Sequence, residues 1–262
     1  MISIAEIGIN HNGSYTEARY LIKESLKHCD YAKIQIKNPE VCVPKEQQGK
    51  VKVWNNEIMS YLEYKKIMEL SDNALDRLFK EFGNRLIASV WDVSSLYRYL
   101  YHASLYSLSK VPRFIKIPSS QLTNKALFDA AYKTGVPIIF STGMSTEHEL
   151  DEVFREYSRQ SIIPLVCNSQ YPHDLAGCDL SKIQVLKNDY MFPEVGFSNH
   201  CVEPAALAFA VAAGADYIEF HVTRSKHQEG TDHASSIEVS ELEAVIGLCN
   251  LRIVTGKHII IF

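Results

Sequence analysis

Short apolar segments rich in β-branched residues alternate with longer segments of helical periodicity along the whole chain. This alternation is typical of βαβ units, in which helices connect parallel strands. Eight segments are predicted as strands: Ser3–Asn10, Tyr31–Lys37, Arg85–Trp91, Phe114–Ser119, Pro137–Thr142, Ile162–Cys167, Glu194–Ser198 and Tyr217–Val222.

Amphipathic or apolar helical stretches lie between these strands, and Gly135 and Gly214 each follow such a stretch as C-terminal helix residues commonly do. The stretches include Thr16–His28, Tyr61–Phe82, Asn124–Lys133, Glu147–Arg159 and Glu203–Ala213, with a last helix from Ser240 to about Val254. A doubly wound sheet is the alternative to a closed barrel, but no glycine-rich phosphate loop follows the first strand. We therefore predict a (β/α)8 TIM barrel.

The length of 262 residues is close to the roughly 250 residues of a bare (β/α)8 barrel, which predicts one domain over residues 1–262. Asn38–Ser60 is the longest irregular region, and such βα loops in barrels usually cover the active site. A net charge of −4 gives no basic field for a nucleic acid or an anionic membrane, so neither is an expected partner.

The six cysteines are scattered, without the close pairs that mark zinc knuckles or small disulfide frameworks. No basic leader opens the chain, and no apolar stretch approaches the roughly 20 residues that cross a bilayer. We expect a cytoplasmic protein with reduced thiols.

Polar side chains gather at the predicted strand ends, where the active site of a (β/α)8 barrel lies. In strand order they are Glu6, Asn10 and His11; Lys33 and Gln35; Ser89 and Asp92; Lys116, Ser119 and Ser120; Ser141 and Thr142; Asn168, Ser169 and Tyr171; Ser198, Asn199 and His200; Glu219 and His221. Their convergence on one mouth, more than any single residue, predicts a site.

Lys33 and Lys116 lie within apolar strands, where an unpaired ammonium would lose several kcal/mol of solvation. Two lysines with several hydroxyls and an amide suit a small ligand with several negative charges, such as a phosphorylated carboxylate. The structural alternative is a pair of salt bridges to neighbouring carboxylates.

His200 and His221 end consecutive strands, so we expect them to be neighbours on the rim and able to share one metal ion. Two imidazoles leave coordination positions open for water and substrate, as a Lewis-acid metal site requires. Hydrogen-bonded core or rim histidines are the alternative, and His11, His227 and His233 are further candidates.

At these same residues the chain resembles the N-acetylneuraminate (sialic acid) synthase family, whose members also make legionaminate and pseudaminate precursors. The matching segments are Ala5-Glu6-Ile7-Gly8-Ile9-Asn10-His11-Asn12-Gly13, Lys33-Ile34-Gln35, Lys116-Ile117-Pro118-Ser119, Ser141-Thr142-Gly143-Met144, Cys167-Asn168-Ser169-Gln170-Tyr171-Pro172, Gly196-Phe197-Ser198-Asn199-His200, Glu219-Phe220-His221 and Gly230-Thr231-Asp232-His233. Each segment is weak by itself, but together they follow the barrel from end to end.

The resemblance implies a phosphoenolpyruvate site formed by Lys33, Lys116, Ser119, Ser141, Asn168, Ser169 and Ser198. It implies a divalent metal, typically Mn²⁺ with Mg²⁺ or Co²⁺ as alternatives, on His200 and His221. Glu6 would hold hydroxyls of an open-chain N-acetylmannosamine-like sugar, with help from Tyr171 and Asp232, and Gln35 also matches a family position. Glu6, Lys33 and Lys116 are the implied catalytic residues.

The implied reaction is a transferase reaction. The methylene carbon of phosphoenolpyruvate attacks the metal-polarised sugar aldehyde, water adds at the enol carbon, and phosphate leaves by C–O cleavage to give a nonulosonic acid. The implied partners are thus two small molecules, phosphoenolpyruvate and an N-acylated hexosamine, and the family resemblance favours a homo-oligomer.

Three residues depart from the family pattern: Val166 replaces a histidine, Asn199 an aspartate, and Val90 a threonine. The resemblance covers the barrel domain only, and we expect a protein without the C-terminal antifreeze-like domain that many members carry. Three alternatives stay open: a sister synthase for legionaminate- or pseudaminate-type sugars, a metal-dependent aldolase or isomerase, and a non-catalytic barrel that binds a metabolite.

Overall fold

Eight parallel strands form a closed ring in the computed structural model, which describes residues 1–106, 111–169, 174–255 and 258–261. Each strand pairs with the next, and β1 also pairs with β10, from Ile2 opposite Tyr217 to Glu6 opposite His221. The strands are β1 (Ile2–Gly8), β2 (Tyr31–Ile36), β5 (Leu86–Val90), β6 (Ile115–Ile117), β7 (Ile138–Ser141), β8 (Ile162–Val166), β9 (Gly196–Asn199) and β10 (Tyr217–Thr223). The eight predicted strands are confirmed.

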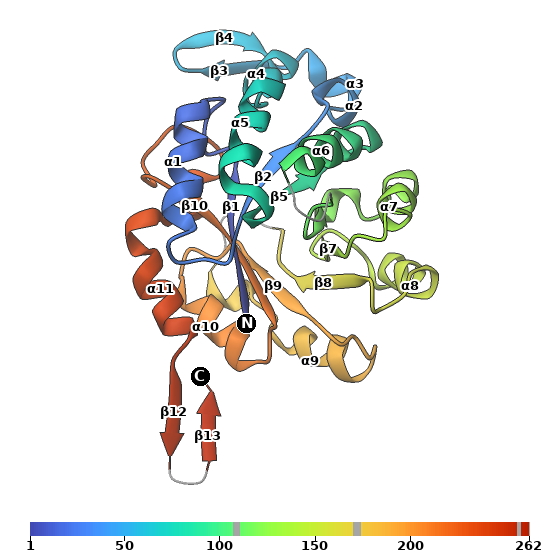
Figure 1. The fold of residues 1–262 in the computed structure, drawn as a ribbon, viewed down its shortest axis with the longest axis vertical. Coiled ribbons are helices and arrows are strands. Elements are labelled where there is room, and N and C mark those ends of the chain that lie inside the picture. Colours follow the sequence, from blue (N-terminus) through green and yellow to red (C-terminus); the bar gives the residue numbers. More distant parts are fainter. Residues whose placement is uncertain (107–110, 170–173, 256–257, 262) are drawn as a thin grey trace.

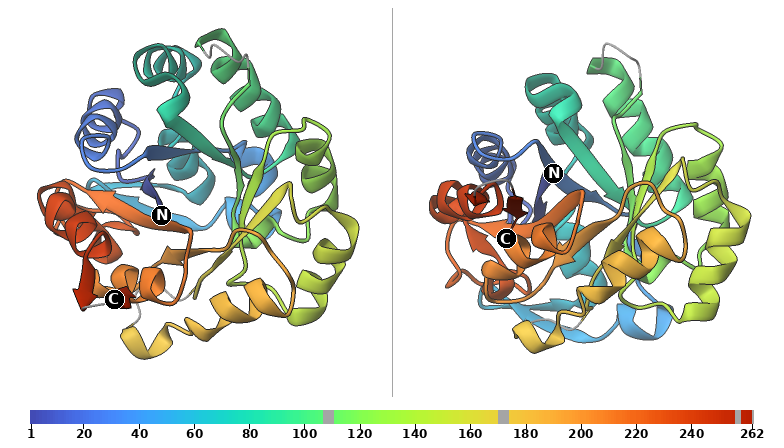
Figure 2. Two further views of the ribbon diagram at one scale, coloured as in Figure 1. Left: turned by 60° about the horizontal axis from the view of Figure 1, so that its bottom comes forward. Right: turned by 90° about the horizontal axis from the view of Figure 1, so that it is seen from below.

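Helices follow every barrel strand and surround the ring, as the two views in Figure 2 show. They are α1 (Tyr15–Ser25), α4 (Tyr61–Ile67) with α5 (Asp72–Phe82), α6 (Val93–Tyr106), α7 (Lys125–Tyr132), α8 (Glu147–Glu156), α9 (Ser181–Asn188), α10 (Ala205–Ala212) and α11 (Leu242–Cys249). The predicted (β/α)8 barrel is therefore confirmed.

Two of the predicted helices end elsewhere in the structure. The single helix Tyr61–Phe82 is wrong, because Ser71 caps a new helix by accepting a hydrogen bond from the backbone N–H of Ala74. The last helix stops at Cys249 rather than near Val254, because the β-branched run that follows favours a strand. There β12 (Arg252–Thr255) pairs with β13 (His258–Ile261).

The predicted loop Asn38–Ser60 contains regular structure. Helices α2 (Pro39–Cys42) and α3 (Lys45–Gln48) precede a hairpin of β3 (Val51–Trp54) and β4 (Glu57–Ser60). Figure 1 shows this insertion, at the top, at the carboxyl end of the barrel strands and the β12–β13 hairpin at the opposite end. The insertion therefore lies at the end of the barrel where the site was predicted. A short strand, β11 (Ile237–Glu238), extends the sheet beside β10.

The barrel interior has two layers. An apolar layer fills the amino-terminal half, and it consists of Ile4, Ile87, Phe114, Ile139, Ile163, Leu165 and Tyr217. Because side chains on a strand alternate between faces, the inward positions two residues further along are Glu6, Ser89, Lys116, Ser141 and Glu219. The polar layer thus rests on an apolar layer, and a second, larger core lies between the strands and the helices.

No helix in the described part of the chain is long and apolar enough to cross a membrane. All six cysteines are described, and none of them forms a disulfide.

Glycine at position 196 is a packing requirement of the barrel. A Cβ atom there would lie 2.4 Å from Leu165 Cδ2 and 2.7 Å from Tyr217 Cβ. We expect Gly196→Ala to lower the free energy of unfolding by about 1–3 kcal/mol through overpacking, measured by urea denaturation. Gly247→Ala is the matched control, because a Cβ at this position of α11 meets no atom within 4 Å and should stabilise the helix by up to about 1 kcal/mol. Equal midpoints for the two variants would contradict this account.

Candidate active site

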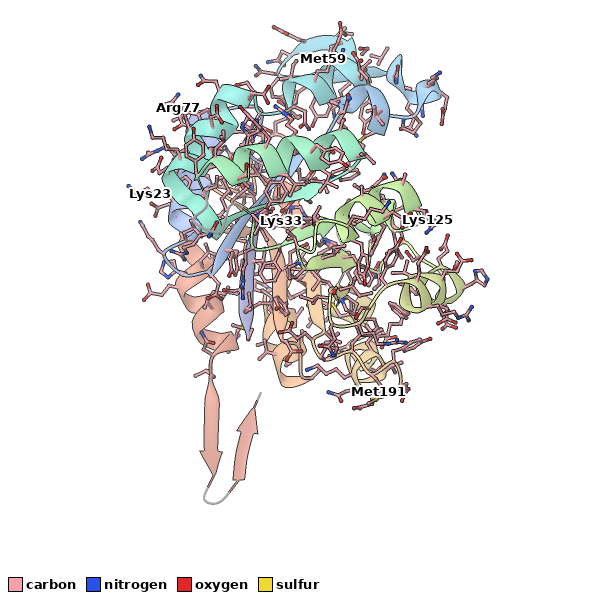
Figure 3. The ribbon with its side chains drawn as sticks, turned by 45° about the vertical axis from the view of Figure 1, so that its right-hand side comes forward. Lys23, Lys33, Met59, Arg77, Lys125 and Met191 are labelled. Atoms are coloured by element: carbon pink, nitrogen blue, oxygen red, sulfur yellow. The ribbon has the colours of Figure 1, made fainter. Side chains whose placement is uncertain are left out.

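A cavity of about 620 Å³ opens at the carboxyl ends of the barrel strands. It is lined by Glu6, Ile9, Lys33, Gln35, Lys37, Lys65, Ser89, Trp91, Lys116, Pro118, Ser119, Ser120, Ser141, Met144, Ser169, Ser198, His200, Glu219, His221, Thr231 and Asp232. Figure 3 shows the labelled Lys33 at the barrel strands in the middle of the molecule, whereas Lys23 and Lys125 lie on outer helices. Nearly every strand contributes a side chain, so the predicted convergence on one mouth is confirmed.

Glu219 connects the two buried lysines at the floor of this cavity. Its Oε2 lies 3.2 Å from Lys33 Nζ, and its Oε1 lies 3.3 Å from Lys116 Nζ. Lys33 Nζ also contacts Glu6 Oε2 at 2.9 Å. All four side chains are no more than 6% exposed. The salt bridges considered as the structural alternative are therefore present, within the cavity itself.

The two lysines differ in their electrostatic surroundings. Burial alone would lower the pKa of Lys33, but the carboxylates of Glu219 and Glu6 outweigh it and raise that pKa. Burial lowers the pKa of Lys116, and the one carboxylate of Glu219, opposed by the charge of Lys33, does not compensate. The positive charge of Lys116 is thus compensated less fully than that of Lys33. An added anion would therefore stabilise the charged form of Lys116 more.

Glu219 titrates far from its ordinary range. Burial would raise the pKa of this carboxyl, but Lys116 and Lys33 lower it to about 2. Ser198 Oγ supports the charged form by donating to Glu219 Oε1 at 3.0 Å. The floor of the cavity therefore holds two lysines and two acidic side chains in direct contact with one another.

Hydroxyl and amide groups surround this charged floor. Lys116 Nζ donates to Ser141 Oγ at 2.6 Å, and Gln35 Nε2 donates to Glu6 Oε1 at 2.8 Å. On the neighbouring wall, Ser119 Oγ and Ser169 Oγ are 3.2 Å apart. These groups can donate to a phosphate or a carboxylate, and Lys116 lies among them.

His200 and His221 are neighbours, as predicted, with ring centroids 5.7 Å apart. His200 Nδ1 is 2.7 Å from the carbonyl oxygen of Asn168, a contact that requires the proton on Nδ1 and leaves the lone pair on Nε2. Burial and the nearby His221 lower the pKa of His200 to about 3, so its imidazole is neutral. His221 Nδ1 lies 3.8 Å from Asp232 Oδ2.

The first strand bends next to these histidines. Its register with β2 shifts between Glu6 and Gly8, and Gly8 has a φ of +56°. A Cβ at Gly8 would lie 3.3 Å from the His221 ring and 3.4 Å from Asp232 Oδ2. Glycine therefore allows both the left-handed backbone and the close approach of His221.

The donor set fits a metal ion that keeps open coordination positions. Two adjacent imidazoles are suitable ligands for Mn²⁺ and similar ions, and Asp232 stands next to one of them. No group of three or more histidine, cysteine or acidic side chains in the described ranges is arranged to hold a metal. Other ligands would come from water or substrate.

The other histidine candidates do not line the cavity. His11 Nδ1 accepts a hydrogen bond from the backbone N–H of Gly13 at 3.0 Å, and His233 Nδ1 lies 2.7 Å from Thr223 Oγ1. His227 is exposed. These contacts hold loops in place.

Most of the predicted site residues line the one cavity. They are Glu6, Lys33, Gln35, Lys116, Ser119, Ser141, Ser169, Ser198, His200, His221 and Asp232. Asn168 does not line the cavity. Its side-chain amide donates to the backbone carbonyl of Gly177 at 3.1 Å, and its own backbone carbonyl contacts His200. Tyr171 lies outside the described residues, so its role stays a prediction.

The cavity residues without a role among the sequence-based predictions include Glu219, Lys37, Lys65 and Trp91. Lys37 continues the inward series of Lys33 and Gln35 by two residues, a signal that the strand pattern contains. Lys65 belongs to α4, and no local pattern distinguishes it from a surface lysine.

Removal of the central carboxylate tests this network. We expect Glu219→Gln to lower the free energy of unfolding at pH 7 by about 3 kcal/mol, because it leaves Lys116 buried without its carboxylate. The carboxyl has an ordinary pKa of 4.5 and a folded pKa of about 2. It therefore contributes stability above about pH 4.5 that is lost as the pH falls toward 2.

The measurement is urea unfolding at pH 7 and pH 3. The wild type should lose more stability between these values than Glu219→Gln does. Glu81→Gln is the control, because Glu81 pairs with Arg19 at the surface and should change the midpoint far less. The network is not structural if the two variants have the same midpoint at pH 7.

The chain matches the model of the NeuB family over residues 21–258. It is 34% identical over 259 residues to the uncharacterized protein MJ1065 of Methanocaldococcus jannaschii, which covers 96% of this chain and 70% of that protein. It is 31% identical to the N-acetylneuraminate-9-phosphate synthase of Drosophila melanogaster, over 92% of this chain and 65% of that protein.

Among solved structures, the fold matches a N-acetylneuraminic acid synthetase from Leptospira borgpetersenii, crystallised with citrate, with a TM-score of 0.82. The two sequences are 26% identical, and the match covers 95% of this chain and 82% of the other. The chain spans about two thirds of the length of the relatives it matches. On the family match and these similarities together, the chain belongs to the NeuB family.

Proposed function

We propose that the chain condenses phosphoenolpyruvate with the open-chain aldehyde of an N-acylated hexosamine and releases phosphate and a nonulosonic acid. The observation that carries the proposal is the placement of two buried lysines and two adjacent imidazoles in one cavity. A cavity of this size lies within the 300–1,000 Å³ typical of small-molecule sites.

Lys116 is the main group for the anionic donor. Its ammonium is shared between Ser141 and a single carboxylate, so it has donor capacity left for a phosphate or carboxylate oxygen. Ser119 and Ser169 add two hydroxyls on the same side of the cavity. Lys33, held between Glu6 and Glu219, orients both carboxylates, and Ser198 fixes Glu219.

Glu6 and Gln35 form the acceptor side. Glu6 contacts Lys33 and Gln35, and as a cavity-lining carboxylate it has further lone pairs that can accept from sugar hydroxyls. Asp232 lies beside His221, where it can do the same near the aldehyde end.

A divalent cation would be held by His200 and His221, and when bound it supplies Lewis-acid polarisation of the aldehyde oxygen. The carbonyl of Asn168 fixes the tautomer of His200 and so orients this imidazole for metal binding. Carbon–carbon bond formation joins the phosphoenolpyruvate methylene to the aldehyde carbon, water adds to the enol carbon, and the C–O bond to phosphate breaks. The buried lysines and serines hold the departing phosphate.

A non-catalytic barrel that binds a metabolite is the second candidate. It is favoured by one observation, namely that both lysines already have carboxylate partners within the protein. A sister synthase for legionaminate- or pseudaminate-type sugars would use the same residues and differ in the acyl groups of its acceptor.

The six unpaired cysteines support a reducing, cytoplasmic location.

The deciding experiment incubates the protein with Mn²⁺, phosphoenolpyruvate and N-acetylmannosamine and measures phosphate and α-keto acid. Release of phosphate that requires both substrates supports the synthase. Binding of phosphoenolpyruvate without turnover of any acylated hexosamine favours the metabolite-binding barrel, and a metal-dependent reaction without phosphoenolpyruvate favours an aldolase or isomerase.

We expect His221→Ala to lower kcat by at least about 100-fold, because one of two metal-binding imidazoles is lost. His148→Ala is the matched control, since His148 lies on the exposed face of α8 with a side chain that is 79% exposed. Circular dichroism and urea midpoints check that both variants fold. Wild-type turnover in the folded His221→Ala variant would remove His221 from the site.

A further inference from the structure

Two thiols lie in contact just beyond the end of β9. Cys201 follows His200 in the chain and is 2% exposed, whereas Cys178 is half-buried and packs against the same apolar core. The two thiols share a side-chain hydrogen bond. The Cys201 thiol also donates to Glu203 Oε2 at 2.8 Å. A disulfide between two such sulfur atoms therefore requires only a local movement of the chain.

Both cysteines are linked to His200, by different routes. Cys201 is its covalent neighbour. Cys178 follows Gly177, whose backbone carbonyl accepts from the side-chain amide of Asn168 at 3.1 Å. The backbone carbonyl of Asn168 in turn lies 2.7 Å from His200 Nδ1. The thiol contact thus closes a ring of contacts around the imidazole, and a change at either sulfur atom affects the group that orients it.

The two sides of this ring differ in how firmly they are held. The backbone of Cys201 is fixed by Asn199, whose side chain donates to the carbonyl of Cys201 at 3.1 Å and accepts from its N–H at 3.2 Å. Cys178 instead follows the one-turn helix η3 (Leu175–Gly177), none of whose residues is buried. A bond between the sulfur atoms is therefore expected to move the Cys178 side, and with it the carbonyl that holds the amide of Asn168.

A second pair of cysteines shows why this pair is suited to oxidation. Cys29 and Cys249 are close enough to interact electrostatically, but each is only 3% exposed, so a reagent in solution reaches neither sulfur atom in the folded chain. Cys178 is partly exposed and meets such a reagent first, and Cys201 lies behind it as the second thiol. Redox-sensitive cysteines are commonly accessible and stand next to a second cysteine of this kind.

We propose that Cys178 and Cys201 form a reversible disulfide, and that this bond disturbs the orientation of His200. The reagent is a small disulfide such as oxidised glutathione, which exchanges with an accessible thiol. In a reducing compartment a disulfide of this kind is transient and reports oxidation. Weaker metal binding is the expected consequence, and this part of the inference rests on the proposed function.

Two thiol–disulfide exchanges form the bond. The sulfur atom of Cys178 attacks one sulfur of oxidised glutathione, and the first glutathione leaves with the proton of Cys178. The sulfur atom of Cys201 then attacks that of Cys178 in the mixed disulfide. Its proton passes to the carboxylate of Glu203 and from there to the second glutathione as it leaves. Two electrons pass from the protein to the reagent, and reduced glutathione reverses both steps.

The first test equilibrates the protein at graded ratios of reduced to oxidised glutathione and counts free thiols. Two of the six thiols should be lost together and return on reduction, and mass spectrometry should find the peptide of Cys178 joined to that of Cys201. Cys178→Ser should lose this step. Cys42→Ser is the matched control and should keep it, since Cys42 is also a half-buried thiol that donates to a carboxylate, that of Asp92 at 3.2 Å. A lasting mixed disulfide at Cys178, without the bond to Cys201, overturns the inference.

The second test observes His200 without any metal. In the reduced protein, ¹⁵N NMR should show a protected proton on Nδ1, the atom that contacts the carbonyl of Asn168, and His200→Gln identifies its signal. Oxidation should shift this signal and speed its exchange with water in the wild type but not in Cys178→Ser. An oxidised protein with the disulfide formed and the signal unchanged contradicts the proposed link to His200.

The third measurement separates this inference from the proposed function. Titration of Mn²⁺ by electron paramagnetic resonance should give about 10-fold weaker binding in the oxidised wild type than in the reduced protein, as expected when the group that orients a ligand is displaced. If neither form binds Mn²⁺ but the first two results hold, the disulfide stands and the metal site of the proposed function fails. If Mn²⁺ binds and turnover occurs but no disulfide forms, the synthase stands and the thiol pair fails.

Discussion

The site depends on one constraint, namely that four charged side chains are buried above the apolar layer of the barrel interior. The ammonium groups of Lys33 and Lys116 are buried next to this apolar layer, where water cannot solvate them. They therefore require the carboxylates of Glu219 and Glu6. Lys116 donates to Ser141, Ser198 donates to Glu219 and Gln35 donates to Glu6, and these contacts fix the charged groups before any ligand arrives. The contacts that stabilise the barrel mouth are thus the same contacts that position its side chains for ligand binding.

Much of this arrangement follows from the strand pattern. A period of two places Glu6, Lys33 and Glu219 on inward faces once the strands are known, and ring closure brings Glu6 and His221 into register. The histidine pair was predictable for the same reason, since His200 and His221 end adjacent strands. Strand ends in a closed barrel meet at one mouth, and no other knowledge of the fold is needed to group them.

Other features depend on contacts that no local pattern encodes. The break between α4 and α5 comes from the cap at Ser71, in a stretch whose periodicity alone favours one helix. The amide of Asn168 donates to Gly177, a choice set by loop geometry. Lys65 lines the cavity from α4, the helix that follows the insertion, and nothing in the sequence of this helix distinguishes it from a surface helix.

The charge balance of the floor also indicates how the two ligands depend on one another. Two lysines and two carboxylates leave no surplus positive charge for an anionic donor, apart from the incompletely compensated Lys116. A cation on His200 and His221 would add that surplus, and the donor would in turn lower the cost of placing a cation beside buried lysines. Each ligand is therefore expected to raise the affinity for the other, since a coupling free energy between two sites is reciprocal. Glu219 also opposes the effect of burial on Lys116, because its carboxylate raises the pKa that burial lowers.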